Sequence, residues 1–255
     1  MNDYIYFCAY FYKKSKINLS LYKEKQMKRR IDTFINRQGL NNYIDFITML
    51  NNDNNLYEHF LNYITINVTE FFRNPEQWNA LSNDILPPLT KNKKKLKIWS
   101  CACSSGEEVY SLQFILHSEN INYKLMATDI DSRVLKKAYN GIYDIRQIKN
   151  INSLSINKYF TKLDDIKYSV KDEYKKNIRF AVLNLLENEY PQDIDLILCR
   201  NVLIYLTEKA KGNILEKLSN ALCTGGVLFV GSTEQIIYPQ NYGLKAHKLF
   251  FYKKV

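Results

Sequence analysis

The sequence predicts an α/β protein in which a small all-α N-terminal domain precedes a mainly parallel sheet. Up to about residue 90, apolar residues recur at the spacing of amphipathic helices. After residue 95, short apolar runs alternate with helical segments, as in β-α-β units whose crossover helices connect parallel strands. We therefore expect a helical domain at residues 1–90 and a sheet domain at residues 91–255.

Three amphipathic helices are expected in the N-terminal domain. Ser20 can cap the first helix and Gly39 can end it. Apolar residues recur every three to four positions at 43–50 and again at 56–64, which predicts the second and third helices. The proline pair at 87–88 interrupts helical structure and a solvated lysine run follows, so the domain boundary is placed there.

Six apolar runs are the predicted strands of the sheet domain. They are LKIWS (96–100), KLMAT (124–128), IRFAVL (178–183), DLILC (195–199), GVLFVG (226–231) and LFFYKK (249–254). The stretch 141–177 does not fit the alternation of strands and helices. We expect it to form a small β subdomain inserted into the sheet domain.

The composition of the 255-residue chain excludes several classes of protein. No apolar run reaches the ~18 residues of a membrane span, and Asp3 stands where a secretory signal would carry positive charge. The five cysteines show neither a disulfide-like spacing nor a zinc-site pattern, so we expect reduced thiols, no bound metal and a cytoplasmic protein. The net charge of +10 either steers the chain toward an acidic partner or reflects an ordinary lysine-rich surface.

Polar residues follow the predicted strands at the positions where ligands of open α/β sheets bind, beyond the carboxyl ends. They are Glu107 and Glu108 after the first strand, Asp129 after the second, Asn184 after the third, and Arg200 and Asn201 after the fourth. The first strand leads into a helix through a loop whose one glycine is Gly106, a layout typical of nucleotide-binding turns. The small residues at 102–106 allow a ligand to approach the backbone closely.

The two glutamates distinguish between possible ligands. A dinucleotide pyrophosphate at this helix N-terminus would be repelled by Glu107, whereas a ligand with an ammonium and a sulfonium group would be attracted. S-adenosylmethionine carries both groups, and Asp129 is suited to its ribose hydroxyls. The alternative is that Glu107 and Glu108 are only favourable first-turn charges of a helix. The order of the polar residues favours a Rossmann-like, S-adenosylmethionine-dependent methyltransferase sheet.

Six sequence blocks, in this order, resemble the CheR family, the chemotaxis methyltransferases that esterify glutamates of chemoreceptors. They are NVTEFFRN (67–74), WSCACSSGEEVYS (99–111), ATDIDSRVLKKAYNGIY (127–143), NLLE (184–187), CRNVLIYL (199–206) and GGVLFVGSTE (225–234). The resemblance extends from about residue 17 to residue 252 and includes a basic helix at 22–31. It implies S-adenosylmethionine as methyl donor, S-adenosylhomocysteine as product, and glutamyl methyl esters on membrane chemoreceptors.

The resemblance also implies the residues of the site. The implied cofactor contacts are Asn67, Thr69, Arg73, Glu107 for the ammonium group, Asp129 for the ribose, Asn184 and the Leu185 backbone for the adenine, and Arg200 and Asn201 beneath the cofactor. Glu107 is preferred to Glu108 for the ammonium group. Arg73 and Tyr205 are the implied catalytic residues, which align the reacting groups. The alternative for Arg73 is a structural ion pair.

The expected substrate is acidic, because the methylation helices of chemoreceptors carry many carboxylates. Lys25, Lys28 and Arg29 lie near one side of the basic helix and suit docking on such a bundle, although an ordinary solvated face is the alternative. Family members that bind a receptor's C-terminal pentapeptide carry a glycine-containing loop in the β subdomain. Residues 159–176 contain no glycine, so we expect no such binding.

Two other functions stay open. A nucleic-acid methyltransferase would also suit the charge and the many tyrosines, but no N-P-P-Y-type motif or pair of catalytic cysteines stands in the expected strand context. A non-catalytic module of the same fold is disfavoured because Arg73, Glu107, Asp129 and Tyr205 are all present. We expect a monomeric enzyme that binds no nucleic acid and does not insert into a membrane.

Overall fold

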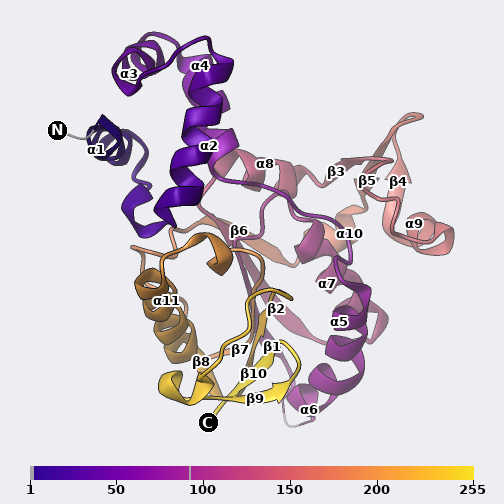
Figure 1. Ribbon diagram of the computed structural model, residues 1–255. Helices are drawn as coiled ribbons and strands as arrows, with labels where there is room; N and C mark the ends of the chain where they lie inside the picture. The colour runs from indigo at the N-terminus through magenta and orange to yellow at the C-terminus, as the bar shows by residue number, and fades with distance from the viewer. Residues whose placement is uncertain (1–2, 92) are drawn as a thin grey trace. The chain divides into compact units, whose positions relative to one another are not determined.

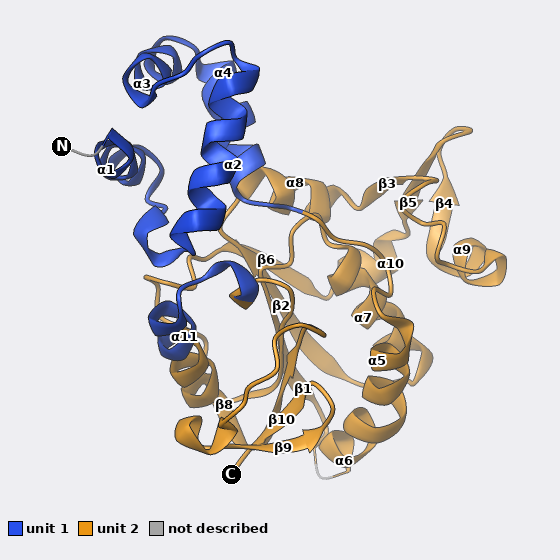
Figure 2. Cartoon of the chain, in the orientation of Figure 1, with its two compact units in different colours: residues 1–67, 204–213 blue, residues 68–203, 214–255 orange. Residues whose placement is uncertain are grey.

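The computed structural model describes residues 3–91 and 93–255, which divide into two compact units (Figure 2). Unit 1 comprises the described residues up to Asn67 together with Ile204–Asn213, and unit 2 comprises Val68–Leu203 and Ile214–Val255. The division after Asn67 differs from the boundary expected near residue 90. The reason is that the helices between the two positions bury their apolar side chains in the core of unit 2.

Unit 1 is built from α-helices. Its elements are α1 (Asp3–Ser15), the 3-10 turn η1 (Leu19–Leu21), α2 (Glu24–Arg37), α3 (Tyr43–Asn52), α4 (Asn54–Ile64) and the first turns of α11 (Glu208–Ala221). The three expected helices are α2, α3 and α4, and α1 is an additional one. The expected helix cap at Ser20 is wrong. Ser20 lies in η1, where its N–H donates to Asn18 Oδ1 at 3.1 Å, and α2 begins after Lys23, which makes no side-chain capping bond.

Helix α1 buries an aromatic face inside unit 1. Phe7 and Phe11 are fully buried on this face, one helical turn apart. The centroid of the Phe7 ring lies 5.8 Å from the ring centroids of both Phe46 and Phe60, within the range of favourable aromatic pairs. Exposed apolar residues such as Ile5 lie on the opposite face of α1, and they conceal the helical periodicity in the sequence.

Unit 2 is organised around a seven-stranded sheet with the order β6-β2-β1-β7-β8-β10-β9 (Figure 1). Its strands are β1 (Leu96–Cys101), β2 (Tyr123–Asp129), β6 (Ile178–Val182), β7 (Ile194–Cys199), β8 (Leu222–Val230), β9 (Leu244–Lys248) and β10 (Phe251–Lys254). The pairs from β6 through β8 are parallel, and β10 pairs antiparallel with β8 and β9. The mainly parallel sheet is thus confirmed. The edge strand β9 is absent from the expected strands because its side chains are mostly exposed and form no apolar run.

Helices cover the main sheet. They are α5 (Pro75–Ala80), the π-helical turn η2 (Leu81–Ile85), α6 (Leu86–Thr90), α7 (Glu107–Ser118), α8 (Ser132–Asn140) and the C-terminal part of α11, with the 3-10 turns η3 (Leu203–Tyr205) and η4 (Pro239–Tyr242) in the connections. Trp78 and Leu86 pack with Leu112 of α7 and Ile98 of β1 in one buried cluster. Figure 1 shows α5, α6 and α7 on one side of the sheet and α11 on the other.

The stretch 141–177 contains a second, three-stranded antiparallel sheet with the order β3-β5-β4. Its elements are β3 (Ile142–Asp144), α9 (Ser153–Tyr159), β4 (Phe160–Lys162), β5 (Lys167–Val170) and α10 (Asp172–Lys175). An aromatic cluster includes Tyr143 and Phe160 of this segment together with Phe71 and with Phe114 of α7. The small sheet is therefore anchored on α7 and on the segment that follows Asn67.

Phe7→Ala tests whether α1 is an integral part of unit 1. Phe7 is 0% exposed, so the substitution leaves a cavity, and we expect the free energy of unfolding in a denaturant titration to fall by about 3–5 kcal/mol. Ile5→Ala, at a side chain that is 58% exposed, should change it by less than about 0.5 kcal/mol. Equally small effects of both substitutions would show that α1 does not contribute to this core.

Candidate functional site

Three parallel strands of unit 2 end side by side. The register pairs Cys101 of β1 with Thr128 of β2 and with Cys199 of β7. The loop 102–106 and Arg200 therefore leave the sheet at the same edge as the end of β2. The chain order of the strands reverses between β1 and β7, and in open α/β sheets ligands bind at this point, beyond the carboxyl ends.

The loop between β1 and α7 turns tightly. Ala102, Ser104 and Gly106 have φ values of 60°, 50° and 96°, in the left-handed region. A Cβ atom on Gly106 would lie 2.9 Å from both Ala138 Cβ and Tyr143 Oη, so close packing requires glycine there. The buried Ser104 hydroxyl has no hydrogen-bond partner among the described residues. The loop thus leaves one polar group available to a ligand.

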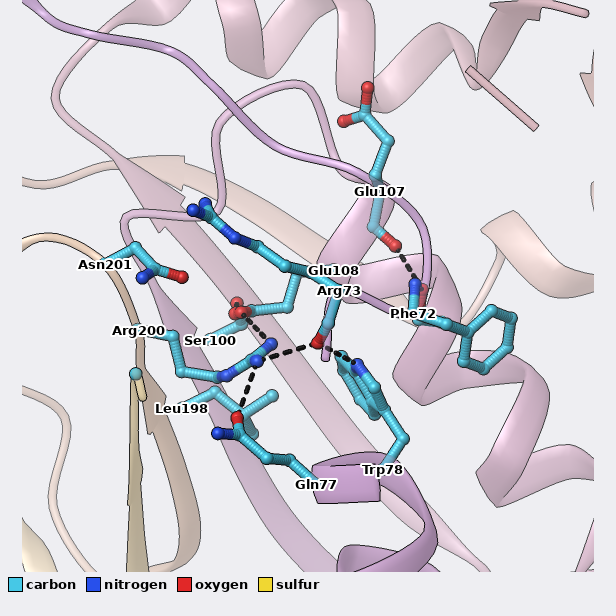
Figure 3. Close-up of polar contacts among 12 residues, drawn as sticks. Phe72, Arg73, Gln77, Trp78, Ser100, Glu107, Glu108, Leu198, Arg200 and Asn201 are labelled. Atoms are coloured by element: carbon cyan, nitrogen blue, oxygen red, sulfur yellow. Dashed lines mark hydrogen bonds and ion pairs between the residues drawn. The ribbon is translucent and has the colours of Figure 1, made fainter. Parts of the chain in front are cut away.

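Glu108, in the first turn of α7, forms a buried ion pair with Arg200 (Figure 3). Its Oε2 lies 3.2 Å from Arg200 Nη1, and its Oε1 accepts a hydrogen bond from Ser100 Oγ at 2.9 Å. Arg200 Nη2 donates to Gln77 Oε1 at 2.8 Å and to the Arg73 carbonyl oxygen at 2.9 Å. Desolvation raises the pKa of Glu108 and lowers the pKa of Arg200, and each shift is opposed by the partner's charge. Both Nη atoms of Arg200 are therefore engaged by protein groups.

Glu107 points away from this ion pair (Figure 3). Its carboxylate accepts hydrogen bonds from Ser105 Oγ at 2.7 Å and from Gln147 Nε2 at 2.9 Å, and the residue is 1% exposed. Burial raises the pKa of Glu107, and the hydrogen bonds offset this rise only in part. Within residues 3–91 and 93–255, no cation forms a salt bridge with Glu107. Among the described residues, this buried carboxylate has no opposite charge at salt-bridge distance, and the charge of Lys137 lowers its pKa only slightly against the effect of burial.

Arg73 is held through its backbone. Its carbonyl oxygen accepts hydrogen bonds from Arg200 Nη2 and from Trp78 Nε1, the latter at 3.0 Å. The preceding Phe72 donates its N–H to Ser111 Oγ of α7 at 2.9 Å. Figure 3 shows the Arg73 side chain extending away from the Arg200 cluster, and its guanidinium makes no salt bridge in the described part of the chain. A structural ion pair, the alternative considered for Arg73, is therefore not found among these residues.

Asp129 ends β2 and is held by backbone N–H groups. Its Oδ2 accepts a hydrogen bond from Ser104 at 2.8 Å and its Oδ1 from Asp131 at 3.0 Å. Burial raises the pKa of Asp129 to about 6, although these hydrogen bonds favour the charged form. The Asp129 carbonyl oxygen accepts from the N–H of Leu183, the residue before Asn184, at 3.0 Å. Two expected site residues thus lie at neighbouring strand ends.

The turn after β6 is stabilised by hydrogen bonds of its own. Asn184 Oδ1 accepts from the Leu186 N–H at 3.0 Å. The carbonyl oxygen of Leu185 accepts from Tyr190 Oη at 2.6 Å and from Lys217 Nζ at 3.2 Å. Asn184 and Leu185 are therefore positioned by the protein itself.

Asn201 directly follows the ion-paired Arg200 and has a left-handed φ of 61°. The buried carboxylate of Glu234 accepts hydrogen bonds from the N–H groups of Asn201, of Leu203 at 2.6 Å and of Gly231 at 2.8 Å. Glu234 was not among the expected site residues. The signal was present, because Glu234 follows β8 at the same edge of the sheet.

Two further residues at the site, Gln77 and Gln147, were also missed. Gln77 binds Arg200 from α5, and Gln147 binds Glu107 from the connection after β3. Each is a single polar residue outside every block that carried the resemblance. No signal in the sequence could have identified them.

The expected site residues are divided between the two units. Asn67 and Tyr205 belong to unit 1, where Asn67 Nδ2 donates to Thr65 Oγ1 at 2.9 Å and the Tyr205 carbonyl accepts from the Lys23 N–H at 2.9 Å. The remaining ones belong to unit 2. Of these, half-buried Thr69 makes no hydrogen bond to the others within the described residues.

The groups at this edge of unit 2 fit S-adenosylmethionine better than an anionic nucleotide. Glu107 offers a buried negative charge for an ammonium group, and the Asp129 oxygens keep lone pairs for hydroxyl donors. The unsatisfied Ser104 hydroxyl offers a further polar contact. The phosphates of a dinucleotide would be repelled by both carboxylates.

Comparisons with known proteins identify the family. Residues 2–65 match the CheR methyltransferase all-alpha domain, and residues 67–248 match the CheR methyltransferase SAM binding domain. The chain is 41% identical over 255 residues to a chemotaxis protein methyltransferase of Listeria monocytogenes, covering 99% of this chain and 97% of that protein. It is 34% identical to that of Borreliella burgdorferi, covering 88% and 85%, and 30% identical to that of Escherichia coli, covering 88% and 80%.

The described residues also contain no helix that is long and apolar enough to cross a membrane. The expected fold of a helical domain and a methyltransferase sheet is confirmed by both family matches. The chain belongs to the CheR methyltransferase family, and S-adenosylmethionine is its methyl donor.

Proposed function

We propose that this methyltransferase esterifies glutamate side chains of chemoreceptors. The observation that carries the proposal is the near full-length similarity to chemotaxis protein methyltransferases. The different surroundings of the two adjacent glutamates support the cofactor part of it. Glu108 is engaged by Arg200, which leaves the buried Glu107 for the ammonium group of S-adenosylmethionine.

Two other proposed cofactor contacts lie at the ends of strands β2 and β6. Asp129 would accept hydrogen bonds from the ribose hydroxyls, and Asn184 with the Leu185 backbone would bind the adenine. We assign Asn67, Thr69 and Asn201 to the surroundings of the cofactor from the family resemblance. Arg200 has a different role, because both of its Nη atoms bind protein groups. Through these atoms it would position the Arg73 segment, and its buried Nε, which has no hydrogen-bond partner among the described residues, is the donor left for the cofactor.

The proposed chemistry requires no protein base. Bound S-adenosylmethionine supplies an electrophilic methyl group on a sulfonium. A glutamate side chain has a pKa of ~4.3 in solution and is already ionised at neutral pH, so the chain has only to align it and exclude water. The guanidinium of Arg73, which has no salt bridge among the described residues, would pair with the incoming carboxylate. The Tyr205 hydroxyl would orient that carboxylate.

Docking would use the basic face of α2. Lys25 and Arg29 are exposed, and Lys28 Nζ lies 3.5 Å from Asp32 Oδ2, so Lys25 and Arg29 are the freer charges. Attraction between this face and an acidic receptor helix would speed association, and salt would screen it over ~8 Å at physiological ionic strength. In this proposal, enzyme and receptor helices meet in the cytoplasm.

The experiment that tests the proposal is methyl transfer from labelled S-adenosylmethionine to a purified chemoreceptor fragment, with RNA as the competing substrate. We expect the receptor fragment to be labelled. Mild base should then release the label as methanol, because base hydrolyses methyl esters. A fragment whose acceptor glutamates are replaced by glutamine should stay unlabelled. Label that resists base, or label on RNA alone, would show that the product is not a glutamyl methyl ester. Either result would reject the proposed function.

Removing the charge of Glu107 should weaken cofactor binding, whereas removing the charge of Glu108 should lower the stability of the protein. Glu107→Gln should weaken binding of S-adenosylmethionine by ~1.5–3 kcal/mol, roughly 10- to 150-fold, because the ammonium group loses a charged partner, and it should not lower the stability of the free protein. Glu108→Gln leaves Arg200 buried without its counter-charge and should cost about 3–5 kcal/mol of unfolding free energy. Calorimetry and denaturant titration measure the two effects. The reverse pattern would exchange the two assignments.

Cofactor affinity should fall with pH through the titration of Asp129. Its pKa of about 6 in the folded protein lies above the ordinary value of 3.8, so the carboxylate that accepts the ribose hydroxyls is lost below pH about 6. Affinity at pH 5 should be about tenfold weaker than at pH 7.5. The contribution of Asp129 to stability should move the other way, because the folded state binds its proton more tightly and gains stability as pH falls from about 6 to about 4.

Asp129→Asn is the control for this pH dependence. It should remove the Asp129 component of the affinity profile while it lowers affinity at pH 7.5. An unchanged profile in this variant would assign the titration to another group, with Glu107 as the next candidate because burial also raises its pKa.

A further inference from the structure

Two hydrogen bonds connect the inserted segment 141–177 to the part of unit 2 that carries Glu107. Tyr143 Oη donates to the Ser105 carbonyl oxygen at 2.7 Å, and Gln147 Nε2 donates to Glu107 Oε1 at 2.9 Å. Tyr143 lies in β3, and Gln147 lies in the turn that follows this strand. All four residues belong to unit 2, so both contacts are made within one compact body.

The two oxygens of the Glu107 carboxylate have different partners. Ser105 Oγ donates to Oε2 at 2.7 Å, and Gln147 Nε2 donates to Oε1. With the bond from Ser105 alone, the carboxylate could still turn about that one contact, and the bond from Gln147 fixes the second oxygen. A carboxylate oxygen accepts about two hydrogen bonds, so each oxygen keeps one lone pair for a ligand.

The side chain of Gln147 is itself held by the turn after β3. Its Oε1 accepts a hydrogen bond from the Asp144 N–H at 3.0 Å, and the Gln147 N–H donates to the Asp144 carbonyl at 2.8 Å. Because the oxygen end of the amide faces a donor, the nitrogen end must face Glu107. The turn is anchored on both sides, since Tyr143 and Ile148 are buried in the aromatic cluster of this segment.

Gln147 is exposed, although the carboxylate that it binds is buried. An exposed side chain adds little to the hydrophobic core, and substitutions at such positions usually change stability only slightly. The contact with Glu107 can therefore be removed without a cavity in the protein. This separates an effect on the ligand from an effect on folding.

We propose that Gln147 is a positioning residue for the amino-acid end of S-adenosylmethionine and holds the Glu107 carboxylate in the orientation that the ammonium group meets. The inference rests on the proposed function, in which Glu107 binds this ammonium group. A partner that is oriented before the ligand arrives binds it more tightly, because no side-chain freedom is lost on binding. The inserted segment is thereby part of the cofactor site.

The test compares two ligands. S-adenosylhomocysteine carries the ammonium group and does not react, whereas 5′-methylthioadenosine lacks the whole amino-acid end. Gln147→Met keeps the length of the side chain and removes its amide. Calorimetry should show roughly three- to tenfold weaker binding of S-adenosylhomocysteine, with binding of 5′-methylthioadenosine within about twofold of the wild type. Equal losses for both ligands would overturn the proposal, because they would show a general disturbance of the site.

A double-mutant cycle tests whether Gln147 acts through Glu107. In the Glu107→Gln background the carboxylate is absent, so Gln147→Met should change the affinity for S-adenosylhomocysteine by less than about twofold. The two substitutions should therefore be strongly non-additive, as expected for residues that act as a unit. Full additivity would show that Gln147 acts independently of Glu107, and would overturn the positioning role.

Gln240→Met is the matched control. Gln240 is an exposed residue of η4 in unit 2, and its side chain takes part in none of the hydrogen bonds around Glu107. This variant removes the same amide from the same unit and should keep the wild-type affinity for both ligands. The denaturant midpoints of Gln147→Met and Gln240→Met should both equal that of the wild type. A selective loss of S-adenosylhomocysteine binding in Gln240→Met would overturn the assignment to Gln147.

The single variants separate failure of this inference from failure of the proposed function. Unchanged affinity for S-adenosylhomocysteine in Glu107→Gln rejects the ammonium site itself. Weaker binding in Glu107→Gln with wild-type binding in Gln147→Met rejects only the positioning role. Tighter binding in Gln147→Met would also reject it, because the amide would then compete with the ammonium group for Glu107. Weaker binding in Gln147→Met alone would make Gln147 a direct contact of the cofactor instead.

Discussion

The candidate site depends on the buried ion pair between Glu108 and Arg200. It connects the first turn of α7 to the end of β7, and through Arg200 Nη2 it also fixes Gln77 and the Arg73 carbonyl. Desolvation of both charges works against the pair, so its net contribution to stability is smaller than its geometry suggests. Its main consequence is geometric, because one guanidinium holds the first turn of α7, Gln77 of α5 and the Arg73 carbonyl together.

Helical geometry explains why neighbouring glutamates have different surroundings. Consecutive residues of an α-helix point about 100° apart, so Glu108 meets Arg200 while Glu107 points toward Ser105 and Gln147. A buried carboxylate without a cationic partner is costly to the free protein. A cationic ligand would remove that cost when it binds, which is a physical reason to propose the first turn of α7 as part of the site for a sulfonium cofactor.

The sequence predicted the strands that are apolar runs and the polar residues that directly follow them. The parallel strands are continuous apolar runs, and the residues that follow them must leave at one edge, so Asp129 and Arg200 could be placed beforehand. Helix α1 was missed because apolar residues lie on both of its faces, and β9 because it has no apolar run. Gln147 could not be predicted, because a single glutamine in a loop reaches Glu107 only through tertiary structure.

The proposed reaction joins partners of opposite charge, and the two units differ accordingly. In unit 2 the groups assigned to the cationic cofactor are the carboxylates of Glu107 and Asp129. In unit 1 the docking groups assigned to the anionic substrate helix are the cations Lys25 and Arg29, and Arg73 of unit 2 is assigned to the reacting carboxylate. If these acids and bases shared one pocket, they would pair with each other and neither set would be available to its ligand. Lys25 and Arg29 form no salt bridge with a described residue, so these two charges stay unneutralised until the substrate binds.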